Sequence, residues 1–198
     1  MKDPFALFGM EPRPWINSEL LREAFSERAA ACHPDSNPES DAADRFLELN
    51  AAYQTLKDPV TRLRCLVELS GTIPQQEQKE ITSVPQELIA LFAEIAPIKA
   101  DLGNFLNQRS AAKSPLSLAL LRHEEQKVKT EIAIMEKRLL CEWENSQRLL
   151  HTLDEHWLER SPALINSANE LATKMRFLQK WIASLKLDSL PSTHPSPL

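Results

Sequence analysis

Apolar residues recur at intervals of three and four positions through most of this chain, which is the spacing of one face of an α-helix. The chain has 198 residues but only three glycines, and it shows no strand-like alternation of Val, Ile or Thr. We therefore expect an all-α protein. The pattern is strictest near the C-terminus, where it follows a heptad at Leu164, Ala168, Leu171, Met175, Leu178, Ile182 and Leu185.

The first 71 residues predict four helices separated by turn-forming residues. The first is short and covers residues 3–9, with a capping Asp at its start and a Gly at its end. The second begins at a cap from Asn17 or Ser18 and ends around His33, because Pro34 fixes its own backbone and lacks an N–H. The third follows Asp41 and ends at Lys57-Asp58-Pro59, and the fourth runs from Val60 to Leu69.

The tripeptide His33-Pro34-Asp35 places an imidazole and a carboxylate on a stiff corner between two predicted helices. Neither side chain has a packing reason to lie there. The alternative is structural only: a proline that ends a helix, followed by an Asp that caps the loop. The aromatic and aliphatic residues on the two flanking helices are interpreted instead as core that holds these helices together, namely Phe25, Phe46, Leu49 and Tyr53.

This order of helices around a His-Pro-Asp loop resembles a J-domain. The segments FALFG at 5–9 and LNAAYQTLKDP at 49–59, continuing to Leu66, are similar to those of HscB-type iron–sulfur co-chaperones. The resemblance implies that the loop docks on a DnaK-type chaperone and triggers its ATP hydrolysis, with the chemistry done by the partner. The candidate chaperone-binding residues are His33, Pro34, Asp35, Arg22 and Arg28.

The second helix departs from that family in its charge. J-domains usually present a basic face there, whereas in this chain three glutamates accompany the two arginines, and Arg28 stands where the family usually has a core leucine. Electrostatic steering toward an acidic chaperone surface is therefore expected to be weak. Three arginines elsewhere are candidates to replace part of the missing charge: Arg45, Arg62 and Arg64.

The remaining residues predict a second helical domain. Residues 72–83 form a polar linker, 84–188 an antiparallel three-helix bundle, and 189–198 a disordered tail rich in Pro and Ser. The bundle helices are expected to begin near residue 83, to run from Leu116 to Arg160, and to begin again after Pro162, with a kink at Pro97. The predicted fold is thus an N-terminal four-helix J-domain followed by a C-terminal three-helix bundle.

HscB-type proteins carry such a bundle, and the resemblance implies that it holds the iron–sulfur scaffold protein. Phe177 lies outside the heptad stripe and Trp181 lies one turn further on. This aromatic pair is either a widened bundle face or a binding surface, and both readings stay open. The first bundle helix is more apolar than the family's client face. The candidate client-binding residues are Phe177, Trp181, Leu88 and Phe92.

Several classes of function are not expected. The net charge is −5, and neither residues 1–71 nor the remainder is basic, which argues against a nucleic-acid partner. The three cysteines are isolated, so we expect neither a metal site nor a disulfide framework, and no cofactor. No phosphate-binding loop or nucleophile constellation indicates an enzyme. No targeting segment or membrane span is predicted, so we expect a cytoplasmic protein.

The sequence therefore predicts a co-chaperone that stimulates a DnaK/HscA-type ATPase and delivers a client, for which the iron–sulfur scaffold protein is the candidate. Two alternatives stay open. One is a J-domain adaptor that recruits the chaperone to an unrelated client. The other is a structural helical interaction protein whose J-domain has decayed, a reading that the depleted basic face favours and the retained His-Pro-Asp residues oppose.

Overall fold

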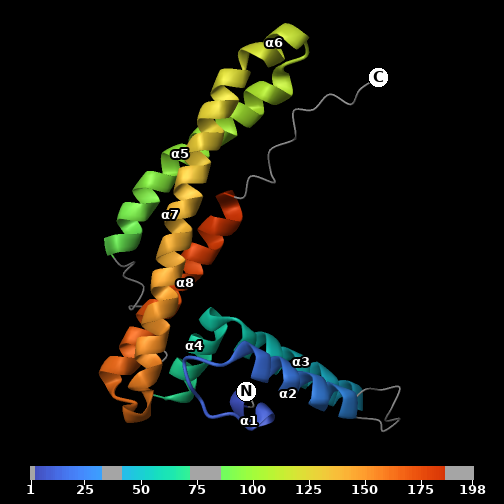
Figure 1. Cartoon of the computed structure of the whole chain (residues 1–198), viewed down its shortest axis with the longest axis vertical. Coiled ribbons are helices and arrows are strands. Elements are labelled where there is room, and N and C mark those ends of the chain that lie inside the picture. Colours follow the sequence, from blue (N-terminus) through green and yellow to red (C-terminus); the bar gives the residue numbers. More distant parts are fainter. Residues whose placement is uncertain (1–2, 33–41, 72–85, 186–198) are drawn as a thin grey trace. The chain divides into compact units, whose positions relative to one another are not determined.

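The computed structural model describes residues 3–32, 42–71 and 86–185 (Figure 1). Within these ranges every regular element is a helix, which confirms the all-α prediction, and none is long and apolar enough to cross a membrane. In chain order the elements are α1 (Pro4–Phe8), α2 (Ser18–Ala31), α3 (Ala42–Lys57), α4 (Pro59–Leu69), α5 (Gln86–Ala111), α6 (Pro115–Leu120), α7 (Arg122–Glu155), the 3₁₀ turn η2 (Trp157–Glu159) and α8 (Pro162–Leu185).

Packing divides the chain into two compact units. Residues 1–83 and 146–175 form the first unit, and residues 84–145 and 176–198 form the second. These units do not coincide with the predicted domains, because the end of α7 and the start of α8 pack with the N-terminal helices. The domain boundaries themselves stay predictions, and the predicted linker and tail lie outside the described residues.

Local capping determines where the N-terminal helices begin and end. The Asp3 carboxylate accepts the Phe5 N–H at 2.9 Å, and Gly9 ends α1 in the left-handed conformation with φ of 61°, which costs a glycine little. Asn17, rather than Ser18, caps α2 by accepting two backbone N–H groups. Asp58 caps α4 in the same way. These short-range signals confirm the predicted order of four helices.

The first unit buries apolar side chains from all four N-terminal helices. Phe5 and Phe8 bring α1 into this core, and Leu49 lies in it as predicted. The rings of Phe25 and Tyr53 stack with their centroids 4.3 Å apart, so α2 and α3 are held together by an aromatic contact between half-buried residues. Phe46 is also half-buried, so the predicted core residues of α2 and α3 are less deeply enclosed than the pattern indicated.

A buried guanidinium crosses the same unit. Arg62 is 5% exposed, and it donates from Nε to the Pro14 carbonyl at 2.7 Å and from Nη1 to the Leu56 carbonyl at 2.5 Å. Burial lowers the pKa of Arg62 from 12.5 to about 10, against the opposite effect of the Asp58 and Asp154 carboxylates. The candidate Arg62 therefore lies inside the unit rather than on an exposed basic face, and two of its donor groups bind buried carbonyls.

The second unit contains an antiparallel pair of helices with a third helix completing its core. Glu94 of α5 pairs with Arg138 of α7, and Arg109 of α5 lies 3.7 Å from Glu125 of α7. A later residue of α5 thus meets an earlier residue of α7, which requires opposite directions, as Figure 1 shows. The shared core includes buried residues of α5, α7 and α8: Leu88, Leu91, Ile95, Phe105, Val128, Ile132, Met135, Leu139, Leu178, Trp181 and Leu185.

The bundle helices differ from the prediction in their continuity. Instead of one helix from Leu116 to Arg160, the chain forms α6, a break at Leu121, α7 and then η2. The Ser114 hydroxyl caps α6 in a reciprocal arrangement with Ser117, and Arg160 adopts a left-handed φ of 43° after η2. By contrast, α5 continues through Pro97 as a single helix.

Replacing Arg62 by Met should destabilise the protein by about 2–3 kcal/mol, because two buried carbonyls would lose a charged donor. Chemical denaturation of the full chain measures this change. Arg148→Met, on an exposed residue of α7, serves as the control and should change stability by at most about 0.5 kcal/mol. An equally small effect at Arg62 would contradict the importance of its hydrogen bonds.

Cys65 should react slowly with a thiol reagent in the folded protein, whereas the exposed Cys141 should react quickly. Burial, with the Asp3 and Glu68 carboxylates, raises the pKa of the Cys65 thiol from 9.0 to about 11. The unfolded chain therefore releases this proton first, and the free energy of unfolding should fall as pH rises from about 9 to about 11. Cys65→Ala should reduce that slope in denaturation experiments, and an unchanged slope would contradict this account.

Candidate functional site

The predicted chaperone-binding loop lies outside the described residues. Helix α2 ends at Ala31 with Cys32 as its C-cap, and α3 begins at Ala42. The end of α2 thus falls close to its expected position at His33. The roles of His33, Pro34 and Asp35 stay predictions. The structure describes only the helices that come before and after these residues, α2 and α3.

The two arginines predicted to contact a chaperone from α2 have different surroundings. Arg22 is exposed and pairs with Glu19 at 2.5 Å, so a neighbouring carboxylate offsets its charge. The guanidinium carbon of Arg28 lies 5.6 Å from the ring centroid of Phe8, a cation–π contact with α1. Arg28 is half-buried and takes a packing position, which fits its place where related sequences were expected to have leucine.

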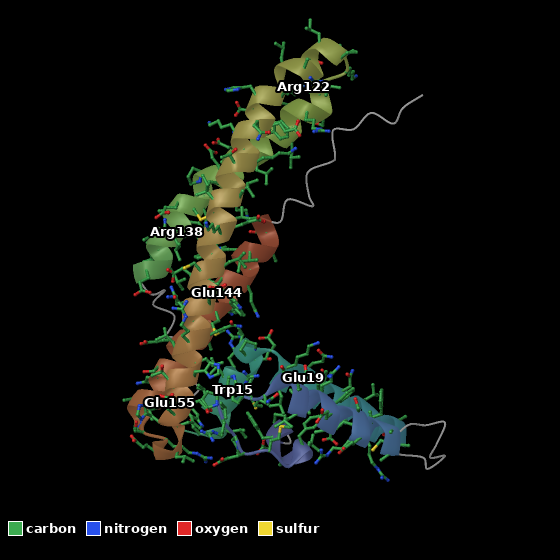
Figure 2. All side chains as sticks on the ribbon, in the orientation of Figure 1. Trp15, Glu19, Arg122, Arg138, Glu144 and Glu155 are labelled. Atoms are coloured by element: carbon green, nitrogen blue, oxygen red, sulfur yellow. The ribbon has the colours of Figure 1, made fainter. Side chains whose placement is uncertain are left out.

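A network that the sequence did not reveal ties residues 13–15 to α7 within the first unit. The Asp154 carboxylate pairs with Arg13 at 3.0 Å and accepts the Trp15 N–H at 3.1 Å. Arg13 also donates to the Asp154 carbonyl. The Trp15 ring lies beside His151 with centroids 5.1 Å apart. Figure 2 labels Trp15 where this connector meets α7. Asp154 is one polar residue among many on a long helix, so no local signal identifies it.

The predicted client-binding residues meet in the second unit, but they are not equally accessible. The Trp181 ring lies 6.4 Å from Phe92 and 5.7 Å from Phe177. Trp181 is only 8% exposed, and Leu88 is fully buried. Both side chains belong to the buried core of this unit, and their roles in client binding stay predictions. Phe92 is 58% exposed and Phe177 is half-buried, so these two remain candidates for contact.

The described residues offer no arrangement suited to metal binding. Among them, no group of three or more His, Cys, Asp or Glu side chains is placed to hold a metal ion. The described residues instead offer helix surfaces, an exposed aromatic ring and paired charges. Exposed aromatic side chains of this kind can serve as contact points for another protein.

Comparison with known proteins finds relatives of the N-terminal helices. Residues 3–64 match the DnaJ domain. The chain is 37% identical over 94 residues to the co-chaperone protein HscB homolog of Chromobacterium violaceum, covering 44% of this chain and 53% of that protein. It is also 37% identical over 81 residues to the homolog of Bordetella avium, covering 38% and 48%. The N-terminal part of the chain is therefore similar to J-domains, and the relatives it matches here are HscB homologs.

The fold of solved HscB proteins extends over nearly the whole chain. HscB from Vibrio cholerae matches with a TM-score of 0.60 at 17% identity, covering 93% of this chain and 95% of that one. Human HscB matches with a TM-score of 0.55 at 20% identity, covering 97% and 84%. These likenesses concern the fold alone. In sequence, the chain spans about half the length of the curated relatives it matches.

Two substitutions at Arg28 separate its packing role from a role in chaperone contact. Arg28→Ala should lower stability by about 0.5–1 kcal/mol through loss of the contact with Phe8, whereas Arg28→Leu should retain stability. Thermal unfolding measures both. If Arg28→Leu is stable and still supports chaperone stimulation, the residue acts in packing; a stable Arg28→Leu protein without stimulation would make it a chaperone contact.

Proposed function

We propose that this chain stimulates ATP hydrolysis by a DnaK/HscA-type chaperone and presents to it a client, the iron–sulfur cluster scaffold protein. The observation that carries the proposal is a four-helix DnaJ domain in one chain with a helical region of HscB-like fold. The protein contributes no catalytic group in this proposal. ATP is hydrolysed by the partner, and the chain supplies contacts that favour its active state.

The α2–α3 pair supports the chaperone half of the proposal. The stacked rings of Phe25 and Tyr53 hold together α2 and α3, the two helices on either side of His33, Pro34 and Asp35 in the sequence. Fixing the helices that flank a binding motif lowers the entropy cost of binding, which favours a specific contact. The weak basic character of α2 predicts an association slower than that of a strongly basic J-domain.

Steady-state ATP hydrolysis by the host's DnaK-type chaperones tests this half. The unmodified chain should raise the rate, and His33→Gln should abolish the increase. His123→Gln, the same substitution at an exposed position on α7, is the control and should behave like the unmodified chain. Absence of stimulation by the unmodified chain would overturn the proposed function and favour a structural interaction protein with a decayed J-domain.

The client half rests on the aromatic residues of α5 and α8. Phe92 projects from α5 next to the buried Trp181, so its exposed ring is backed by a packed core. The ring of Phe177 also lies beside Trp181, and the Arg176 guanidinium is 5.4 Å from the Phe177 ring centroid. A rigidly supported aromatic ring is the kind of residue that dominates binding energy at protein interfaces.

Binding of the purified iron–sulfur scaffold protein tests the client half. Phe92→Ala should weaken binding about tenfold, corresponding to ~1.4 kcal/mol. Phe177→Ala should also weaken it, although this residue packs partly against the core. The control is Ile134→Ala, on a residue of α7 that is similarly exposed. Chaperone stimulation without any scaffold binding would favour the adaptor for an unrelated client.

A further inference from the structure

A cavity of about 440 Å³ opens within the first unit, where the segment after α1 meets α2, the end of α3, the start of α4 and α7. Its floor consists of side chains that are almost completely buried: Leu21, Leu150 and Arg62. Its rim consists mainly of exposed residues: Trp15, Glu19, Arg22, Lys57, Gln147 and His151. Figure 2 labels Trp15 and Glu19 on this unit.

The floor combines apolar surface with a permanent positive charge. The side chains of the two leucines contain only carbon and hydrogen, while Arg62 donates hydrogen bonds to the Pro14 and Leu56 carbonyls. With a pKa of about 10, this guanidinium remains protonated at neutral pH. The acidic groups near it are already engaged, since Asp154 binds Arg13 and Trp15 while Asp58 caps α4.

The rim adds further cations and aromatic surface. Lys57 lies with its Nζ 5.7 Å from the Tyr53 ring centroid, and Arg22 pairs with Glu19. Trp15 and His151 form one wall through their ring contact. The charged residues that line the cavity are thus Arg22, Lys57 and Arg62 on the positive side and Glu19 on the negative side. The lining favours an acidic group next to an apolar one.

We propose that this cavity receives an acidic segment of the DnaK-type chaperone, an Asp or Glu side chain beside an apolar residue, so that α7 forms part of the chaperone-binding surface. The inference rests on the proposed function. Arg22 links the cavity to the predicted contact surface of α2, because it belongs to both. The volume lies at the small end of ligand pockets, about 300–1,000 Å³, and so suits a few side chains rather than a whole helix.

In this arrangement, positive side chains around the cavity take the role of the basic face that α2 lacks. Instead of a basic stripe along one helix, positive groups come from α2, α3 and α4 and surround a single hollow. Gln147 and His151 contribute from α7, a helix outside the N-terminal four. A chaperone bound at this surface would therefore contact residues far beyond the DnaJ domain in the sequence.

The test uses two isosteric substitutions on the same helix. Gln147→Glu places a carboxylate at the rim, whereas Gln126→Glu places one at an exposed position of α7 that does not line the cavity. The measured quantity is the concentration of the full-length protein that gives half-maximal stimulation of chaperone ATPase. Gln147→Glu should raise it about three- to tenfold, and Gln126→Glu should leave it unchanged. The difference should shrink as salt is added, since screening weakens charge repulsion.

A second substitution guards against effects on folding. Lys57→Gln removes one rim cation from an exposed position and should also raise the half-maximal concentration, and thermal unfolding verifies that each variant is folded. Equal half-maximal concentrations for Gln147→Glu, Gln126→Glu and Lys57→Gln, with stimulation still lost in His33→Gln, would overturn this inference and leave the proposed function intact. No stimulation by the unmodified chain would overturn both.

Discussion

The carboxylate of Asp154 determines how the segment between α1 and α2 is placed in the first unit. It binds the Arg13 guanidinium and the Trp15 N–H, joining residues that lie 139 or more positions apart in the chain. Fixing this segment also brings the Pro14 carbonyl to the buried Arg62 and the Trp15 ring to His151. One side chain of α7 thus fixes both a wall of the cavity and the start of α2, because a half-buried charge is stabilised by partners in fixed positions.

The distribution of positive charge distinguishes this chain from the expectation for a J-domain. Arg28 covers an aromatic ring, Arg62 binds carbonyls in the interior, and Arg22 is matched by a carboxylate one turn away. Each arginine therefore has a structural task in addition to its charge. Affinity for an acidic partner then depends on where the positive groups converge, rather than on their number along one helix.

Sequence patterns correctly predicted the helix ends that are determined by interactions between neighbouring residues. The caps at Asp3, Gly9 and Asn17 involve atoms a few residues apart, so their sequence signals were sufficient. Asp154 and Arg62 were not predictable as buried or bridging groups, because on an amphipathic helix they look like ordinary surface charges and their partners lie far away in the sequence. Trp181 is a similar case. Because it lies off the heptad stripe, the sequence allowed either a widened bundle face or a binding surface, and only its packing with residues of α5 and α7 places it in the core.

The contribution of α7 and α8 to both compact units limits how the protein can be divided. A fragment ending after α4 would contain Arg13 and Trp15 without Asp154, and the floor of the cavity would lose Leu150. Replacing the first four helices by those of a J-domain protein would also remove the contacts with Asp154 and Leu150, unless the new segment could make contacts of its own with α7. We therefore expect that the N-terminal helices cannot be exchanged as a separate module without matching changes near position 150.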